Sequence, residues 1–377
     1  MKIVYCIAGT YNSGGMERVL ANKANYLARK GYEIVIITTD QRNRCSFFAF
    51  DARISFYDLE VNYEENNGGT FLDKLVHYPF KQIKHKRRLT DLLMQLKADI
   101  VISMFCNEAS FLWKIKDGSR KILEVHFCRY KRLQLERKGV WKLADSFRNR
   151  MDIRTVRKYD HFVVLTKEDE RYWEDVPRIT VIPNMLSFSF TEPASLSNKK
   201  VIAVGRYDYQ KGFDYLIDAW AIVNKHQPEW VLEIIGGGEW KSRLQKQIDE
   251  SGLQDCICLK APTSDIEEEY RQASMLVMSS RYEGFGMVLV EAQSAGLPVI
   301  SFTCKCGPRD IITDGMDGFL VAEKDVAGLA NTMLCLMQDE KMRRSMGMAA
   351  MKNSRRFSET AVMGQWEELF AHCRKNI

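Results

Sequence analysis

The chain has 377 residues, of which 46% are hydrophobic, and it carries 55 Lys and Arg against 49 Asp and Glu. This length is too great for one ordinary core and suits two α/β domains. No run of about 18 apolar residues is present, which argues against a membrane-spanning helix. The 10 cysteines include no C-x-x-C pair and the 6 histidines complete no zinc site, so we expect reduced thiols and no structural metal.

Short apolar runs suited to buried parallel strands recur along the chain, separated mostly by amphipathic stretches long enough for crossover helices. Residues 1–39 predict strand, loop, helix and strand; the helix opens at Gly14-Gly15 and runs to about Lys30, where Gly31 ends it. Further strand-like runs lie at 100–102, 122–123, 162–165, 201–204, 231–232, 275–278 and 299–300. This alternation predicts parallel sheets.

A domain junction is predicted near residue 190, because 187–200 contains Ser and Pro without helical or strand periodicity. The expected domains are therefore 1–188 and 189–356, each with the strand, loop and helix order of a Rossmann-like domain. Beyond them, residues 358–372 predict a helix whose apolar stripe consists of Ala361, Val362, Trp366, Leu369 and Phe370.

Positive charge is concentrated in the first predicted domain. It holds 33 Lys and Arg against 23 Asp and Glu up to residue 188, whereas the remainder holds 22 against 26. The cations gather at 81–88 and at 129–158, where apolar residues interleave with them. Each cation near an anionic membrane contributes about 1 kcal/mol, so these segments either lie on such a surface or form an ordinary solvated helical face.

The same cations would suit a nucleic acid, but no RNA-binding or helix-turn-helix signature accompanies them, so no nucleic-acid partner is expected. The N-terminus enters a strand at once, with no basic-then-apolar leader. We therefore expect a cytoplasmic protein, with peripheral association at the inner face of the membrane as a further expectation.

The most informative segment is 279–291, which sets Glu283 and Glu291 eight residues apart around a glycine-rich entry into an apolar helix. The glycines let the backbone turn after a buried strand without a Cβ penalty. We expect the helix to begin near Phe285 or Gly286, with Glu291 about two turns in, so that its free N–H groups and positive dipole end suit a phosphate. Taken alone, both acids could equally be ordinary surface charges.

A second segment, 201–213, runs from an apolar strand into a loop that carries Arg206 and Lys211 five residues apart. A guanidinium offers a planar fork to two phosphate oxygens and an ammonium acts as a compact point charge, so the pair suits a diphosphate. Each charge-assisted contact contributes about 1.5–3 kcal/mol. Many transferases neutralise a departing diphosphate with a metal held by a D-x-D motif, which this chain lacks.

Together, the strand-G-R-x4-K-G and E-G-F-G-x4-E segments resemble the retaining glycosyltransferases of family 4 (glycosyl transferases group 1). The resemblance extends over nearly the whole chain and includes Gly14-Gly15-x-Glu17-Arg18, 232–239 and 306–321. It implies an α/β fold of the GT-B type, in which two Rossmann-like domains with parallel sheets face each other across a cleft. A C-terminal helix, about 357–377 in this sequence, would cross back to the first domain.

The resemblance also implies residue roles. Among the catalytic positions, Glu283 would hold the donor sugar, and Arg206 and Lys211 would stabilise the departing diphosphate. His126 ends an apolar run and matches a family histidine beside the transferred sugar, although a lone histidine at a strand end is as often structural. Glu291 would accept hydrogen bonds from the ribose hydroxyls. The other donor-binding positions are Gly14, Gly15, Gly205, Gly284, Phe285, Gly286, Met287 and Val288.

On this basis we expect a metal-independent, retaining glycosyltransferase that moves a hexose or N-acetylhexosamine from a nucleotide sugar to a glycan or lipid-linked saccharide in surface polysaccharide synthesis. A UDP-sugar is the preferred donor, GDP-mannose stays open, and no cofactor besides this co-substrate is expected. Two alternatives remain. A GT-B epimerase or synthase would turn over without an acceptor, and a non-catalytic nucleotide-sugar-binding protein would bind without transfer.

Overall fold

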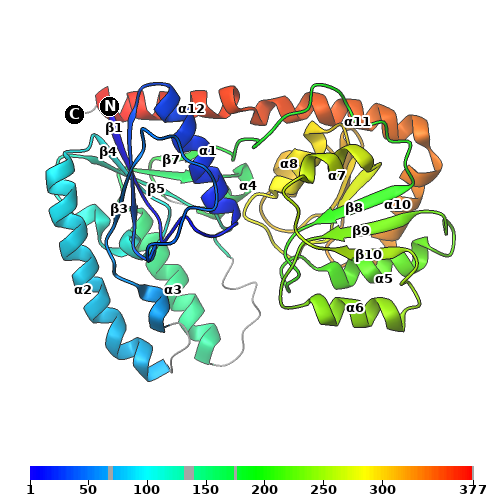
Figure 1. Ribbon diagram of the computed structural model, residues 1–377, viewed down its shortest axis with the longest axis horizontal. Helices are drawn as coiled ribbons and strands as arrows, with labels where there is room; N and C mark the ends of the chain where they lie inside the picture. The colour runs from blue at the N-terminus through cyan, green and yellow to red at the C-terminus, as the bar shows by residue number, and fades with distance from the viewer. Residues whose placement is uncertain (67–70, 131–139, 174–175, 376–377) are drawn as a thin grey trace. The chain divides into compact units, whose positions relative to one another are not determined.

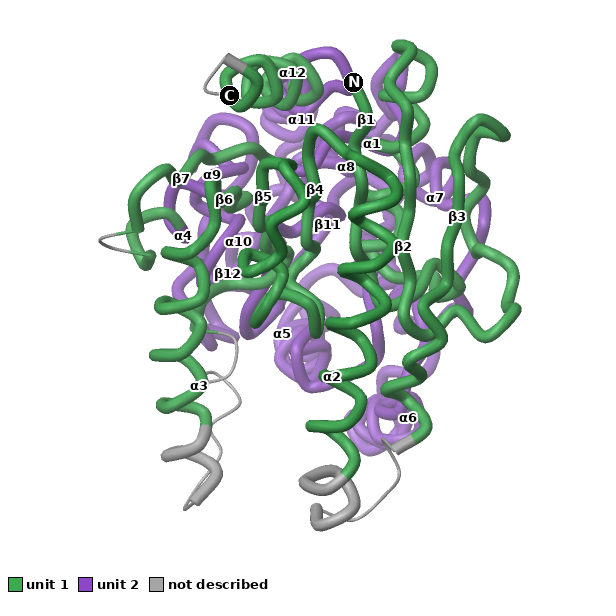
Figure 2. The backbone as a smooth tube through the Cα atoms, turned by 90° about the vertical axis from the view of Figure 1, so that its left-hand side faces the viewer, with its two compact units in different colours: residues 1–165, 170–183, 362–377 green, residues 166–169, 184–361 purple. Residues whose placement is uncertain are grey.

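The computed structural model describes residues 1–66, 71–130, 140–173 and 176–375, which fold into two compact units (Figures 1 and 2). The first unit comprises residues 1–165, 170–183 and 362–377, and the second comprises 166–169 and 184–361. Residues 184–199 carry no helix or strand. The main division of the chain therefore lies beside the segment in which the linker is predicted.

The first unit is built on a sheet of seven parallel strands in the order β3-β2-β1-β4-β5-β6-β7. In register, Ile3 of β1 lies between Ile34 of β2 and Ile100 of β4. The central strands read as continuous apolar runs because helices cover both faces of a parallel sheet. The strands are β1 (Lys2–Cys6), β2 (Glu33–Thr38), β3 (Ser55–Asp58), β4 (Ile100–Ser103), β5 (Arg120–Glu124), β6 (His161–Val164) and β7 (Ile179–Val181).

Helix α1 (Gly15–Arg29) follows the prediction closely. Gly14 is its N-cap residue, Glu17 places a negative charge in its first turn, and Gly31 turns the chain beyond its end with φ +85°. The other helices of this unit are α2 (Phe71–Leu96), α3 (Val140–Val156), α4 (Lys167–Tyr172), which begins within the second unit's segment, and α12 (Glu359–Lys375). Residues 131–139 of the basic stretch 129–158 lie outside the described residues.

The second unit is built on six parallel strands in the order β10-β9-β8-β11-β12-β13. They are β8 (Lys200–Val204), β9 (Val231–Ile235), β10 (Ile257–Lys260), β11 (Met275–Met278), β12 (Val299–Phe302) and β13 (Gly318–Val321). Its helices are α5 (Phe213–Val223), α6 (Lys241–Glu250), α7 (Ile266–Gln272), α8 (Met287–Ser294), α9 (Pro308–Ile311), α10 (Val326–Gln338) and α11 (Glu340–Ser354). The prediction of two Rossmann-like parallel sheets is confirmed.

In each sheet the strand order changes direction at one place, between β1 and β4 in the first unit and between β8 and β11 in the second. The loops that leave the carboxyl ends of two such neighbouring strands diverge, and open α/β sheets bind their ligands at this point. Both informative sequence segments follow strands at the second of these positions, since 205–212 leaves β8 and 279–286 leaves β11.

Helix α12 packs its apolar face within the first unit. Val362, Trp366, Leu369 and Phe370 are buried as predicted, whereas Ala361 is exposed, because it precedes the part of the helix that packs on this unit. The amide of Ala361 instead donates to the Ser358 hydroxyl at 3.3 Å, which caps the helix start. Within the described residues, no helix is both long enough and apolar enough to cross a membrane.

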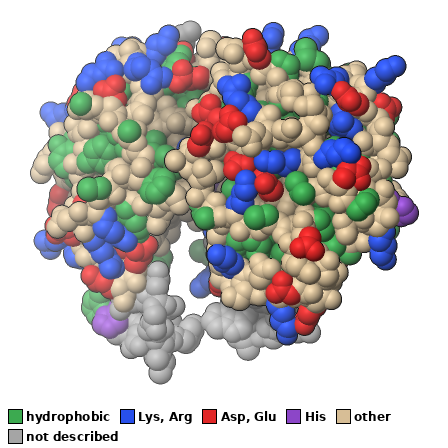
Figure 3. Space-filling model, turned by 45° about the vertical axis from the view of Figure 1, so that its right-hand side comes forward, with side chains coloured by type: hydrophobic (Ala, Val, Ile, Leu, Met, Phe, Trp, Pro, Cys, Tyr) green, Lys and Arg blue, Asp and Glu red, His purple; other side chains and the backbone are tan. Residues whose placement is uncertain are grey.

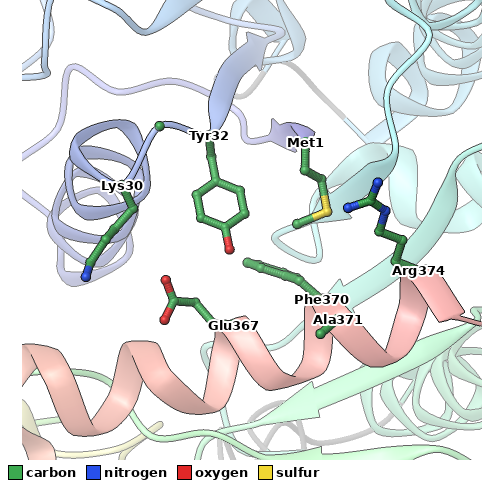
Figure 4. A pocket seen from close by; sticks show the side chains of 8 residues that line it. Met1, Lys30, Tyr32, Glu367, Phe370, Ala371 and Arg374 are labelled. Carbon is green, nitrogen blue, oxygen red and sulfur yellow. The ribbon is translucent and has the colours of Figure 1, made fainter.

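A hollow of about 760 Å³ lies between α12 and the turn that joins α1 to β2 (Figure 4). Tyr32 points from that turn toward Glu367 and Phe370, and its ring centroid lies 6.4 Å from that of Phe370. Met1 and Tyr32 directly precede β1 and β2, so the hollow lies at the amino ends of these parallel strands. Ligand sites of such sheets form at the carboxyl ends, and this hollow is therefore not the candidate active site.

The first prediction concerns Trp366, whose side chain is 1% exposed and contacts the ring of Phe370. Replacing it by alanine should lower the free energy of unfolding of the first unit by about 3–5 kcal/mol, because a large buried aromatic is lost. Denaturant unfolding followed by circular dichroism measures this change. Phe147→Ala, at a 64% exposed position of α3, is the matched control and should change the same quantity by less than about 0.5 kcal/mol.

Candidate active site

The loops after β8, β9, β11 and β12 pack closely against one another. Glycines at the points of contact have no room for a side chain. A Cβ at Gly236 would lie 1.8 Å from the carbonyl oxygen of Gly205, and one at Gly307 would lie 1.8 Å from that of Phe285. Real Cβ atoms do not approach an oxygen so closely, so only glycine allows these backbone contacts. The sequence Gly-Gly-Gly after β9 is thus part of the base of the site.

Lys211 and Glu283 meet across these loops. Nζ of Lys211 donates to Oε1 of Glu283 at 2.6 Å, and the two side chains are only 14% and 7% exposed. The hydroxyl of Ser280 donates to the same carboxylate oxygen at 2.7 Å. The stem of Lys211 passes over Gly205, where a Cβ would lie 3.0 Å from its Cδ and Cε. Two residues that the sequence places 72 positions apart therefore form one buried charged pair.

Arg206 lies in the same loop but is not part of this buried pair. Its side chain is 71% exposed, with Nη2 at 3.1 Å from both Asp208 Oδ2 and Gln210 Oε1. Exposed ion pairs of this kind contribute about 0–1 kcal/mol, so little free energy opposes a turn of the guanidinium toward a bound anion. The structure thus gives the two predicted cations different settings, one fixed and one at the surface.

A further cation, Arg281 in the segment 279–291, has a structural position that the sequence did not reveal. Its guanidinium forms a bidentate pair with Asp214 at 2.6 and 2.9 Å, donates to the carbonyl of Tyr209 at 2.8 Å, and lies 4.2 Å from the ring centroid of Tyr215. Arg281 thereby ties the β11 loop to the start of α5. In the sequence, Arg281 is distinguished only by its closeness to Glu283. That closeness is compatible with a structural role as well as with a binding role.

Helix α8 begins at Met287, with Gly286 as its N-cap residue at φ +95°, slightly later than the start predicted at Phe285 or Gly286. Glycine supplies this left-handed backbone, and no side chain caps the first turn. The prediction that Glu291 lies about two turns into the helix is wrong, because it is the fifth helical residue, in the second turn.

Glu291 is 5% exposed and accepts a hydrogen bond from the hydroxyl of Tyr270 at 2.9 Å. This partner comes from α7, 21 residues earlier in the sequence, and the sequence analysis missed it because no motif links the two positions. The carboxylate therefore has a defined orientation rather than the mobility of a surface charge.

Gly14, Gly15 and His126 belong to the first unit. A Cβ at Gly15 would meet nothing within 4 Å, so the start of α1 is open beside it. Glu17 in the same turn is 8% exposed, and this burial raises its pKa above the ordinary value. His126 follows β5, and its Nε2 lies 3.2 Å from Oε1 of the buried Glu124.

Glu124 is held in turn by Lys23, whose Nζ donates to Oε1 at 2.6 Å and also to Oε2. Burial of the carboxyl by itself would raise its pKa, but the charges of Lys23 and His126 outweigh this and lower it to about 2. The sequence analysis found no reason to select Lys23 or Glu124, since 101 residues separate them.

Two family models match consecutive parts of the chain. The model described as Glycosyltransferase Family 4 matches residues 13–189, and the model described as Glycosyl transferases group 1 matches residues 187–353. Together they extend over most of the sequence and meet where the second unit begins.

Three relatives illustrate the range of matches. The amylovoran biosynthesis glycosyltransferase AmsD of Erwinia amylovora is 27% identical over 98% of this chain and 99% of its own length. A Campylobacter jejuni N-acetylgalactosaminyltransferase, named for a GalNAc-containing glycan on PP-undecaprenol, is 28% identical over 99% of both chains. An exopolysaccharide phosphotransferase of Streptomyces coelicolor is 37% identical over 56% of this chain, but this match spans only 23% of that protein's length.

Solved structures share the fold over the whole chain. Sucrose-phosphate synthase of Thermosynechococcus elongatus aligns with a TM-score of 0.82 over 100% of both chains, at 17% identity. TarM of S. aureus aligns with a TM-score of 0.78 over 98% of both chains, also at 17% identity. At this identity the likeness shows the fold alone, and it confirms the predicted GT-B class.

The glycine contacts lead to the second prediction. Gly236→Ala should lower the free energy of unfolding of the second unit by about 1–3 kcal/mol, because the new methyl group collides with the carbonyl of Gly205 and the loops must separate. Gly364→Ala in α12 is the matched control, since a Cβ there meets nothing within 4 Å. Chemical denaturation of both variants gives the comparison, and equal stabilities would contradict the account of the loop contacts.

Proposed function

Because the chain belongs to glycosyltransferase family 4, we propose that it transfers a hexose or N-acetylhexosamine, with retention, from a nucleotide sugar to a glycan or lipid-linked saccharide in surface polysaccharide synthesis. We infer a UDP-sugar as the donor, with GDP-mannose as the alternative. The observation that carries the proposal is the buried Lys211–Glu283 pair at the point where β8 and β11 diverge.

Lys211 and Glu283 suit the two groups that separate in the reaction, the diphosphate and the transferred sugar. The ammonium stabilises the negative charge that grows on the departing diphosphate, and the carboxylate accepts hydrogen bonds from hydroxyls of the transferred sugar. In the free protein the two groups satisfy each other at 2.6 Å. The donor would enter between partners whose positions are already fixed by Ser280 and by Gly205, so little reorganisation opposes the reaction.

Arg206 and the start of α8 supply the remaining positive charge. The exposed guanidinium turns from Asp208 to the diphosphate, and the uncapped N–H groups at Met287 and Val288 meet it from the helix end. Gly205, Gly284, Phe285 and Gly286 line the same approach. We propose that these groups act in place of a divalent metal.

In the proposed reaction, the bond between the anomeric carbon and the diphosphate oxygen breaks while the acceptor oxygen bonds to the same carbon. The departing phosphate oxygen takes the proton of the acceptor hydroxyl on the same face of the sugar, so the configuration is retained and no protein nucleophile is required. Glu291, oriented by Tyr270, binds the ribose hydroxyls. For Gly14, Gly15 and His126 of the first unit, we propose the donor-binding and catalytic roles that the family resemblance implies.

The proposed acceptor follows from the relatives. The name of the Campylobacter enzyme gives a glycan on PP-undecaprenol, and that of the Erwinia enzyme gives amylovoran biosynthesis. A lipid-linked acceptor would be met at a membrane surface. We therefore propose that this cytoplasmic protein associates peripherally with the inner face of the membrane.

Helices α2 and α3 of the first unit run in similar directions but stand apart in Figure 2, and both carry exposed apolar side chains that suit such an association (Figures 1 and 2). Phe80 and Ile83 on α2 and Phe147 on α3 are more than 60% exposed. Of the predicted basic run, however, Lys81, Lys84 and Arg88 donate to backbone carbonyls of residues 59–62, so part of its charge serves the fold. On the face seen in Figure 3, cationic and anionic side chains are interspersed.

The third prediction tests donor binding. Among nucleoside diphosphate sugars, a UDP-hexose or UDP-N-acetylhexosamine should raise the melting temperature in the presence of EDTA. A ligand at 100 times its dissociation constant adds about 2.7 kcal/mol to the folded state. Arg206→Ala should remove most of this shift, whereas Lys246→Ala, at a 73% exposed position on α6, should leave it unchanged. Stabilisation that requires manganese would contradict the metal-free site, and stabilisation by GDP-mannose alone would reassign the donor.

The fourth prediction tests transfer. Glu283→Gln should lower the transfer rate by about 10²–10³-fold, because one fixed contact to the reacting sugar is lost. Glu250→Gln, at a 65% exposed position, is the control and should retain full activity. Product analysis by NMR with a panel of saccharide acceptors reports both rate and anomeric configuration. An inverted product would refute retention, turnover without acceptor would indicate an epimerase or synthase, and binding without transfer would indicate a binding protein.

A further inference from the structure

A buried row of charged side chains leads from helix α1 to His126. Lys23 is 2% exposed and Glu124 is 1% exposed, and both lie among the large side chains of the first unit. Oε1 of Glu124 is shared, because it lies 2.6 Å from Lys23 Nζ and 3.2 Å from His126 Nε2. The carboxylate thus stands between an ammonium and an imidazole.

Aromatic rings enclose the ammonium of Lys23. Its Nζ lies 4.1 Å from the centroid of Trp366 on α12 and 5.4 Å from that of Tyr5 on β1, and both rings are at most 1% exposed. Cation–π contacts of this kind stabilise a desolvated cation by about 2 kcal/mol. Four segments of the chain, β1, α1, β5 and α12, therefore combine to hold one charged pair.

If the Lys23–Glu124 pair served only the fold, its burial would be an unfavourable way to stabilise the core. Removing two ions from water costs several kcal/mol per ion, and apolar residues of similar volume usually stabilise a core as well or better. The same unit contains a second buried pair, Lys121 with Asp117, whose side chains are 4% and 0% exposed. That pair has no histidine beside it among the described contacts, so it provides an internal comparison.

The charged groups that face His126 come from two elements. Glu124 lies beside Nε2 at the end of β5, and Glu17 in the first turn of α1 interacts electrostatically with the imidazole. Lys23 lies behind Glu124 on the same helix as Glu17.

We propose that Lys23 and Glu124 are positioning residues that fix the orientation of His126, and that Trp366 keeps Lys23 in place. The kinetic part of this inference rests on the proposed function, because that function places His126 beside the transferred sugar. The positional part does not depend on any activity.

The fifth prediction is that breaking the Lys23–Glu124 pair disturbs the setting of His126. Glu124→Gln removes the carboxylate that lies 3.2 Å from Nε2, so the ring resonances of His126 should shift in the NMR spectrum. Lys121→Met, in the same strand as Glu124, should leave them unchanged. The spectra are recorded on the full-length protein, with the resonances assigned by their loss in His126→Ala.

Glu124→Gln leaves Lys23 buried without its partner and could prevent folding. In that case the double variant Lys23→Met/Glu124→Gln is compared with Lys23→Met, and the ring resonances of His126 should differ between the two. Unchanged His126 resonances in Glu124→Gln, or in the double variant relative to Lys23→Met, would overturn the inference whether or not the protein transfers sugar.

A second readout separates positioning from mere support of the fold. Glu124→Gln should lower kcat about 10-fold to 100-fold with little change in the KM for the donor, and this loss should disappear when His126 is already alanine. A loss of equal size in the His126→Ala background would show that Glu124 acts only through stability. If no transfer activity exists, the proposed function fails, and the NMR spectra alone decide the positional inference.

Discussion

The close approach of four loops at the carboxyl edge of the second sheet is the constraint on which the candidate site depends. Because β8 and β11 are neighbours while their loops diverge, Lys211 and Glu283 reach each other across the gap. Gly236 and Gly307 let the backbones touch, and Arg281 fastens the β11 loop to α5. The pair is therefore held by backbone packing and needs no bound ligand to form.

The two units use charge in related ways. In the second unit, Lys211 and Glu283 are buried together and Arg206 remains at the surface. In the first, Lys23 and Glu124 are buried together and His126 lies at the margin of that pair. In both cases a buried ion pair lies beside a third side chain, Arg206 or His126, that is not part of the pair. The groups that fix the geometry and the group that responds to a ligand are therefore different side chains.

The parts of the fold that sequence predicts well are those with local signals. Helix α1 has glycines at both ends, and the central strands are continuous apolar runs. Strand β3 was missed because Ser55–Asp58 is largely exposed at the sheet edge and carries no such run. Local sequence patterns do not predict contacts between distant positions. The contacts of Tyr270 with Glu291 and of Lys23 with Glu124 become visible only in the folded chain.

The glycine-locked base of the site also indicates where donor preference can change. A side chain cannot be added at Gly236 or Gly307 without separating backbones, so variation there would damage the framework before it altered selectivity. Arg206 is less constrained, since its side chain is 71% exposed. A library of variants at Arg206 that keeps Gly236 and Gly307 unchanged would therefore test new nucleotide sugars without destabilising the fold.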